Sequence, residues 1–459
     1  MKAVGASAPR YDGVSAVTGR SVYVDDVRPA GMLHVKALRS IHDSASILRL
    51  NVEPAARLTG VHGIVTASDV PRLIVGPLES QGIAGDEPLL ADHEVRYCGQ
   101  PIAAVAAETE EAARAAVEAI EIDYQPHEPF LDVRLALDPD QPHITPEGNR
   151  FHYERYVERR LRRGDVDRAF EQADVIVEGV YRPTMIEQCP LETQAAVAIP
   201  GSDGRLTIHS TTQALYYSMS IVAEHLQVPL GRLKFVGGMV GGGFGGKVDT
   251  PCESVAALLA LKTGRPAKWA FSREEEMLCS SVRAAWHMEI ADAVTSDGWI
   301  LGRRTLTLHD AGAYTRFSPY GVNKHTFHLA GAYTIPNLAF NSYVVWTNHV
   351  PSSAMRGFGV TSASFAIETH MQRTADVLGI DPWELRLRNA TRAGDITATG
   401  VRVPDPSAVS TLLAAADVAG IALPDRYRSL HDARAPDEEV PDHLRAVVSA
   451  GYSGEGVGV

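Results

Sequence analysis

A glycine-rich segment with a single lysine, Gly241–Lys247, combines residue types that suit ligand binding. It lies between a strand-like run, Leu233–Val236, and a stretch of helical composition, Cys252–Leu261. Glycine tolerates positive φ and lets a ligand approach the main chain, so backbone N–H groups in a strand–loop–helix unit can converge on an anion. The sequence therefore predicts an anion-binding loop, called the glycine loop below, over residues 241–247.

The glycine loop also comes close to the nucleotide-binding pattern G-x-x-x-x-G-K-[ST], in which the final hydroxyl holds Mg²⁺. Val248 stands at that final position and has no hydroxyl. A nucleotide triphosphatase is therefore disfavoured. Taken alone, the pattern leaves open a second interpretation, a glycine-rich turn at a crowded sheet edge.

Composition narrows the class of protein. The chain has 459 residues, 45% of them hydrophobic, and a formal net charge of −13, so we expect several packed domains and no nucleic-acid surface. We find no bilayer-spanning apolar stretch and no signal peptide, and we expect a cytoplasmic protein. The cysteines are widely spaced, which predicts reduced thiols, mostly in the core, and no zinc or iron–sulfur ligand set; they are Cys98, Cys189, Cys252 and Cys279.

Two groups of elements must position the glycine loop. Residues 1–126 combine β-rich runs with an Ala/Glu-rich helical stretch, Thr109–Ile120, and predict an α+β domain. Residues 127–149 are rich in Pro, Asp and His and predict a linker. Residues 150–400 alternate strands and helices, including a short helix after the capping residue Asp165 and the strand-like Val175–Tyr181, and predict a second domain of mixed α/β type.

Residues 401–459 are expected to form a C-terminal extension. The stretch from about Pro424 to His443 is charged and interrupted by proline, which is typical of an exposed segment. The last residues, Gly454–Val459, have the composition of a strand that stops short.

Several further segments occur in the order found in one family, and together they carry a resemblance that the glycine loop alone does not. The segments are Gly19–Asp26, Gly60–Pro71, Cys98–Val105, Pro190–Gln194, Ser210–Gln213, the glycine loop and Met355–Gly359. The chain resembles the large subunits of the xanthine dehydrogenase and aldehyde oxidase family of molybdenum hydroxylases. The resemblance implies an α+β architecture in which an α/β hammerhead domain precedes the first, mixed α/β molybdenum-cofactor-binding domain. The family's second cofactor-binding domain is absent from this sequence.

The resemblance also implies roles for individual residues. Gln213 matches the glutamine near the apical oxo ligand of molybdenum, and Phe244, with Gly243 and Gly245, matches the loop that contacts the cofactor through main-chain groups. Arg356 matches the arginine beside the cofactor, where its charged planar fork suits an oxo or phosphate group. Gln213, Phe244 and Arg356 would thus lie near the metal without ligating it.

Two departures from the family pattern concern the substrate. Val248 stands where purine-oxidising members have a substrate-binding glutamate, which makes xanthine less favoured. Lys324 stands where those members have a pocket arginine, so a positive charge is kept and a carboxylated ring such as nicotinate would suit it; a solvated lysine is the alternative.

Phe358 matches an aromatic residue that packs on a flat heterocyclic substrate.

The arginine-containing segment also bears on one branch of the family. The carbon monoxide dehydrogenase branch has a cysteine in this loop. Ser353–Phe358 has none, which excludes that branch.

No residue of this chain matches the family's general-base glutamate, and Glu192, Glu253 and Glu455 do not take its place. We therefore expect a split large subunit of the nicotinate dehydrogenase kind, with the base on a second molybdopterin-binding chain. A truncated xanthine dehydrogenase-like subunit and a non-catalytic scaffold are the alternatives. The resemblance implies a molybdenum–pterin cofactor, its mononucleotide or cytosine dinucleotide form left open. It also implies [2Fe-2S] and FAD on partner subunits, and oxidation of a heterocycle or aldehyde with water as the oxygen source.

Overall fold

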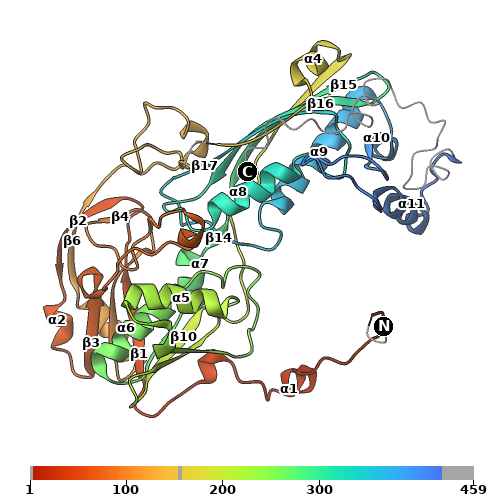
Figure 1. The fold of residues 1–459 in the computed structure, drawn as a ribbon. Coiled ribbons are helices and arrows are strands. Elements are labelled where there is room, and N and C mark those ends of the chain that lie inside the picture. The colour runs from red at the N-terminus through yellow and green to blue at the C-terminus, as the bar shows by residue number, and fades with distance from the viewer. Residues whose placement is uncertain (1–3, 154–157, 426–459) are drawn as a thin grey trace.

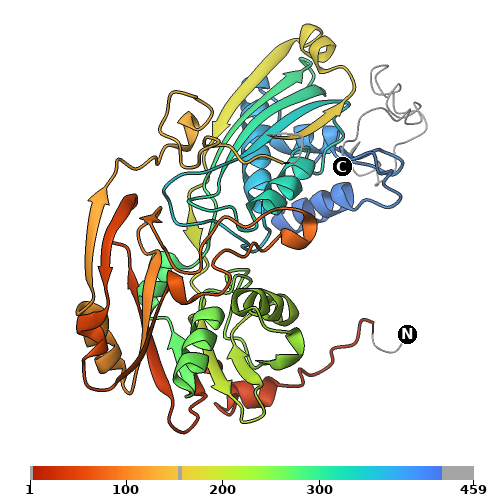
Figure 2. The same cartoon turned by 60° about the vertical axis from the view of Figure 1, so that its left-hand side comes forward.

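A computed structural model describes residues 4–153 and 158–425 of the chain. Two large β-sheets organise it, and Figure 1 shows the seven-stranded sheet in the lower part of the molecule and the five-stranded sheet in the upper part. Figure 2, turned by 60°, shows the same two sheets as separate bodies joined by several crossing segments.

The seven-stranded sheet has the order β12-β11-β10-β13-β1-β5-β3. Its strands are β1 (Leu33–Arg39), β3 (Val61–Thr66), β5 (Pro101–Ala107), β10 (Ala195–Pro200), β11 (Leu206–Ser210), β12 (Leu233–Gly237) and β13 (Ala267–Ala270). Successive side chains of a strand point to opposite faces. In β5, Ala104 and Ala106 pack into one core, while Ala103 and Val105 pack into another on the opposite face. Both faces of this sheet are therefore covered.

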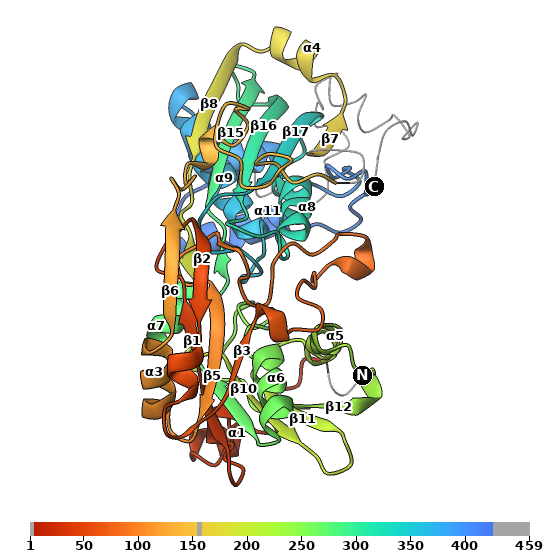
Figure 3. The ribbon, with the colours of Figure 1, turned by 90° about the vertical axis from the view of Figure 1, so that its left-hand side faces the viewer.

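Helices on the two faces supply those cores. On one face lie α5 (Leu215–Leu226) and α6 (Glu253–Thr263), and on the other lie α2 (Glu53–Ala56) and α3 (Glu110–Glu118). Figure 3 shows α3 and α6 on opposite sides of the sheet. Residues 253–260 of α6 are all buried, because this helix is enclosed by the strands and by α5.

The seven-stranded sheet joins two segments that lie far apart in the sequence. Strand β1 pairs in parallel with β13, with Leu33 opposite Ala267. Residues 33–107 and 195–270 thus share one hydrogen-bonded sheet, because strand pairing does not have to follow chain order. Between the two segments, residues 127–149 contain a single 3₁₀ turn, η4 (Val133–Leu135). The predicted domain bounds stay a prediction.

The five-stranded sheet has the order β7-β17-β16-β15-β8. Its strands are β7 (Arg159–Arg163), β8 (Val175–Tyr181), β15 (Trp286–Val294), β16 (Ile300–Asp310) and β17 (Asn337–Val345). Helices α8 (Ser318–His328) and α9 (Val360–Leu378) pack on it, and Val322 and Ala366 share a core with strand residues such as Met288. The two helices place the segments 318–328 and 353–360 side by side.

Shorter elements complete the described chain. The helices are α1 (Gly13–Val17), α4 (Val166–Glu171), α7 (Arg273–Cys279), α10 (Pro382–Asn389) and α11 (Ala408–Ala419). The strands are β2 (Ala45–Asn51), β4 (Glu94–Val95), β6 (Glu121–Pro126), β9 (Ile186–Glu187) and β14 (Val282–Arg283). The remaining 3₁₀ turns are η1 (Val24–Asp26), η2 (Ala67–Asp69), η3 (Glu79–Gln81) and η5 (Leu230–Arg232).

Several predicted elements are confirmed. Helix α3 lies within Thr109–Ile120, strand β8 covers Val175–Tyr181, and Asp165 caps α4 by accepting from the N–H of Arg168 at 3.0 Å. Apart from Pro424 and Asp425, the predicted exposed tail and the predicted strand at Gly454–Val459 lie outside the described residues. In the described ranges, no helix has the length and apolarity needed to cross a bilayer.

The cysteine expectation holds in part. All four cysteines are free thiols. Cys252 and Cys279 are buried, whereas Cys98 is half-buried and Cys189 is exposed. Only two of the four are buried, so the prediction that most lie in the core is wrong. Cys189 sits in the loop after β9 and has a φ of 47°.

Candidate functional site

The glycine loop follows the carboxyl end of β12 and precedes α6, as the sequence predicts. Its backbone takes positive φ at Gly242 (102°), Phe244 (53°) and Gly245 (100°). Two tight turns hold it, with the N–H of Gly246 donating to Gly243 O at 2.8 Å and that of Val248 to Gly245 O at 3.3 Å. Glycine is required at residues 242 and 245, because side chains rarely adopt these φ values.

Close contacts with neighbouring atoms also leave no space for a side chain at residues 243 and 245. A Cβ on Gly243 would lie 2.4 Å from Gln213 Oε1, and one on Gly245 would lie 2.6 Å from Ala354 O. The loop is therefore packed between Gln213, which precedes the N-cap of α5, and the segment Ser353–Gly359, which we call the arginine loop.

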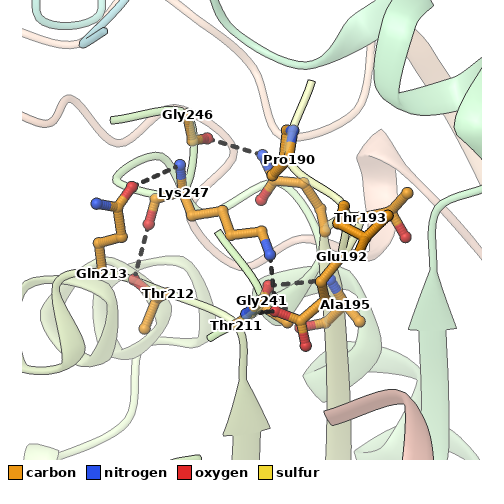
Figure 4. Close-up of polar contacts among 12 residues, drawn as sticks. Pro190, Glu192, Thr193, Ala195, Thr211, Thr212, Gln213, Gly241, Gly246 and Lys247 are labelled. Carbon is orange, nitrogen blue, oxygen red and sulfur yellow. Dashed lines mark hydrogen bonds and ion pairs between the residues drawn. The ribbon is translucent and has the colours of Figure 1, made fainter. Parts of the chain in front are cut away.

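Gln213 is tied to the glycine loop at three points. Its Oε1 accepts from the N–H of Gly245 at 2.9 Å, and its own backbone N–H donates to Lys247 O at 2.8 Å. Oε1 also accepts from the N–H of Lys247 at 3.3 Å (Figure 4). Because the carbonyl end of the side chain is used in this way, the amide end, Nε2, is left without a partner among the described residues. Gln213 is exposed, so this donor is available to a ligand.

Lys247 points into the protein. Its side chain is fully buried, and Nζ donates to Glu192 Oε2 at 2.8 Å; the same oxygen accepts from the N–H of Gly241 at 2.7 Å (Figure 4). Lys247 therefore fastens the loop from behind and cannot reach a phosphate in front of it. A nucleotide triphosphatase needs a lysine that reaches the phosphates as well as a hydroxyl for Mg²⁺. This chain has neither, because Lys247 points inward and Val248 has no hydroxyl.

A second buried contact lies behind the loop. Gln194 donates from Nε2 to Gly246 O at 2.8 Å, and its backbone N–H donates to Glu276 Oε2 at 2.8 Å. Burial raises the pKa of the Glu276 carboxyl to about 7, and the nearby charge of Glu187 acts in the same direction. The sequence identified Pro190–Gln194 only as one of the family motifs. In the structure, Gln194 of this motif helps to hold the glycine loop in its conformation.

Arg356 meets the glycine loop through its backbone. Its N–H donates to Phe244 O at 2.7 Å, and its carbonyl accepts from Arg283 Nη2 at 2.7 Å. The side chain of Arg356 is exposed and has no ion pair or hydrogen bond within the described part of the chain. The structure thus brings Gln213, Phe244 and Arg356 together at one edge, with an unpaired guanidinium among them.

Phe358 and Lys324 are connected through a residue that sequence reasoning missed. Tyr320 lies four residues before Lys324 on α8, and Lys324 Nζ sits 4.9 Å from its ring centroid. The rings of Tyr320 and Phe358 are 5.6 Å apart and inclined by 38°. The i,i+4 spacing on a helix is the signal that would have found Tyr320. Val248 is not part of this set of contacts and directly follows the glycine loop in the chain.

The close packing of α8 on the arginine loop depends on glycine. A Cβ on Gly321 would lie 3.1 Å from the Phe358 ring, and one on Gly359 would lie 2.4 Å from Gly321 O. Phe358 itself has a φ of 30°, which side chains rarely adopt. The aromatic ring is therefore held in one place by the backbone around it.

Comparison with known families identifies two regions. Residues 18–128 match the family described as "Aldehyde oxidase and xanthine dehydrogenase, a/b hammerhead domain", and residues 148–390 match the "Molybdopterin cofactor-binding domain". The second match alone spans more than half of the chain and includes both the glycine loop and the arginine loop.

Individual relatives agree. The xanthine dehydrogenase molybdenum-binding subunit of Escherichia coli is 33% identical over 86% of this chain and 53% of that protein. The nicotinate dehydrogenase large molybdopterin subunit of Eubacterium barkeri is 33% identical over 86% of this chain and 91% of that protein. The solved structure of an aldehyde oxidoreductase from Desulfovibrio gigas superimposes with a TM-score of 0.83 at 30% identity, covering 92% of this chain and 45% of that one.

The chain thus spans about half the length of the xanthine dehydrogenase protein and of the solved aldehyde oxidoreductase. The hammerhead and cofactor-binding matches follow each other in the predicted order. This chain belongs to the xanthine dehydrogenase and aldehyde oxidase family of molybdenum hydroxylases, and it contains that family's hammerhead domain and a molybdopterin cofactor-binding domain.

Proposed function

We propose that this chain is the molybdopterin-binding part of a molybdenum hydroxylase that oxidises an N-heterocycle or an aldehyde with water as the oxygen source. The observation that carries the proposal is the meeting of Gln213, Phe244 and Arg356 at one exposed edge. Backbone hydrogen bonds hold each of them, through Gly245 N–H and Arg356 N–H. Groups held in this way are preorganised for a ligand.

The residues at this edge fit a cofactor that carries oxo and phosphate groups. Gln213 Nε2 and the Arg356 guanidinium are exposed donors without protein partners in the described ranges. Gln213 and Arg356 would hold the cofactor as hydrogen-bond donors, and Gly243, Phe244 and Gly245 would hold it through main-chain groups. All would lie beside the metal without ligating it. The cofactor, when bound, would supply the oxidation chemistry.

For the substrate, we propose a wall made of Phe358, Tyr320 and Lys324, with Val248 contributing separately from the position directly after the glycine loop. Phe358 and Tyr320 offer aromatic surface to a flat ring. Lys324 lies over the Tyr320 ring, and no carboxylate pairs with it among the described residues, so its charge is available to an anionic group. Val248 offers no hydrogen bond, which favours a carboxylated heterocycle over a purine.

Replacing Lys324 with methionine tests the substrate proposal. We expect KM for a pyridine carboxylate such as nicotinate to rise roughly tenfold, the equivalent of about 1.4 kcal/mol, because one charge contact is lost while the apolar stem is kept. The neutral amide of the same ring is the control, and its KM should not change. Equal KM values for the carboxylate in both proteins, with equal molybdenum content, would contradict the role of Lys324.

For the whole enzyme, we propose a second molybdopterin-binding polypeptide that supplies the general base, and partner subunits that carry [2Fe-2S] and FAD. The nicotinate dehydrogenase large molybdopterin subunit supports a divided large subunit, because the match covers 91% of its length.

Metal analysis separates this function from a scaffold role. The chain is purified together with the proteins encoded beside it, and molybdenum, pterin, iron and flavin are measured. We expect close to one molybdenum and one pterin per copy of this chain, and Arg356→Met should lower both. The function is wrong if the intact assembly contains iron and flavin but no molybdenum or pterin.

A further inference from the structure

A cavity of about 100 Å³ is lined in part by the segment directly after the glycine loop, and neither Gln213 nor Arg356 lines it. One wall is the inner face of α5, including Tyr217, and another is the segment after the loop, including Asp249. Trp269 of β13 and the adjacent Phe271 form a third wall, and residues of the hammerhead domain, including Arg39 and Tyr97, form a fourth. The cavity thus lies where the two parts of the chain meet.

Three of the lining residues carry a buried polar atom that has no hydrogen-bond partner among the described residues. These atoms are Tyr217 Oη, Asp249 Oδ2 and Trp269 Nε1. Buried polar groups in folded proteins are nearly always hydrogen-bonded, and an unpaired one costs about as much as a lost hydrogen bond. Three such atoms around one cavity point to an occupant that both donates and accepts hydrogen bonds.

The charges around the cavity indicate a neutral occupant. Arg39 pairs with Glu275 at 3.1 Å, and Arg316 makes two hydrogen bonds of 2.7 Å to Glu87. Both guanidinium groups therefore have a carboxylate already. Burial raises the pKa of the Asp249 carboxyl, although Arg316 lies 3.7 Å from its Oδ2 and opposes the shift. An anionic ligand would find no unpaired cation among the described residues that line the cavity, and the Asp249 carboxyl already has Arg316 3.7 Å from its Oδ2.

We propose that this cavity binds a cluster of ordered water molecules that joins Tyr217, Asp249 and Trp269. A water needs about 10–15 Å³ of such space and two to four polar partners, so the cavity has room for several. The proposal does not depend on the proposed function.

The water cluster would support the two loops that carry the cofactor residues. Asp249 follows Val248 directly, and its Oδ1 accepts from Ser353 Oγ in the arginine loop at 3.2 Å. With its other oxygen bonded to water, Asp249 bridges the end of the glycine loop to the start of the arginine loop. Asp249 is thus a positioning residue whose second contact is water.

A double-mutant cycle between Tyr217→Phe and Trp269→Phe tests the proposal in the full chain, purified with the subunits that accompany it. Tyr217→Phe should raise the equilibrium constant for unfolding roughly fivefold, because a hydroxyl bonded to water is lost. If the cavity is dry, the same change removes an unpaired hydroxyl, and stability should rise. The two substitutions should also be non-additive by at least about threefold, since shared water couples residues that do not hydrogen-bond each other.

Tyr216→Phe on the exposed side of α5 is the matched control, and it should combine additively with Trp269→Phe. A high-resolution crystal structure gives the direct measurement, with waters expected at about 2.7–3.2 Å from Trp269 Nε1 and Asp249 Oδ2. An empty cavity, a solute other than water, or additive effects for Tyr217 and Trp269 would each overturn the proposal.

Discussion

Gly245→Ala is expected to reduce the molybdenum and pterin content of the purified protein at least about tenfold and to destabilise the fold by about 2–4 kcal/mol. The residue has a φ of 100°, and an added Cβ would lie 2.6 Å from Ala354 O and 2.9 Å from Met355 Cα. Both neighbours are backbone atoms, so no side-chain rotation relieves the contact. The glycine loop and the arginine loop must separate, which breaks the hydrogen bond from Arg356 N–H to Phe244 O.

Gly264→Ala is the matched control for this prediction. Gly264 ends α6 with a φ of 66°, and a Cβ there would meet nothing within 4 Å. Gly264→Ala should therefore lower the free energy of unfolding only by the cost of the backbone conformation, about 1–2 kcal/mol. The cofactor content of this variant should stay unchanged. Metal and pterin analysis of both variants, with denaturant unfolding, gives the comparison. If the Gly245 and Gly264 variants lose the same stability and keep the same cofactor content, the contact between the two loops has no role in binding.

Local signals predicted several elements of the fold correctly. The aspartate at residue 165 caps a helix, the β-branched run Val175–Tyr181 forms a strand, and glycines mark the turn between β12 and α6. Each of these signals is carried by residues that lie next to one another, so the physics that produces the element is visible in the sequence.

The parts that could not be predicted depend on contacts between distant residues. In the sheet that joins β1 to β13, Leu33 pairs with Ala267. Neither strand has a sequence feature that identifies the strand with which it pairs. The bond from Lys247 to Glu192 spans 55 residues. The sequence shows that Lys247 follows glycines, as a lysine does in the nucleotide-binding pattern. Only the fold shows that its side chain points into the protein.

Helix α8 shows how an unfavourable local signal can mislead. Pro319 and Gly321 argue against a helix over residues 318–328. Pro319 is tolerated because it lies in the first turn, where its missing N–H has no partner to lose. Gly321 is explained by packing, since a Cβ there would lie 3.1 Å from the Phe358 ring. These residues therefore do not by themselves indicate the helix that places Tyr320 one turn before Lys324.

Lys247→Met is expected to destabilise the protein by about 3–5 kcal/mol, because it leaves the Glu192 carboxylate without its cation. The Lys247 side chain is fully buried and that of Glu192 is 11% exposed, so water cannot replace the lost contact. Glu192 Oε1 already has no partner among the described residues, and Oε2 would keep only the N–H of Gly241. Denaturant unfolding measures the loss, and cofactor content should fall with it because the loop loses its anchor.

Two further variants separate the charge from the shape of this contact. In Lys247→Met/Glu192→Gln no buried charge remains, so the double variant should recover at least half of the stability lost in Lys247→Met. The exposed pair of Lys262 and Asp69, 2.7 Å apart with 45% and 32% of their side chains accessible, is the control, and Lys262→Met should cost no more than about 1 kcal/mol. A double variant as unstable as Lys247→Met would show that the ammonium's hydrogen bond itself, and not relief of a buried charge, stabilises the back of the glycine loop.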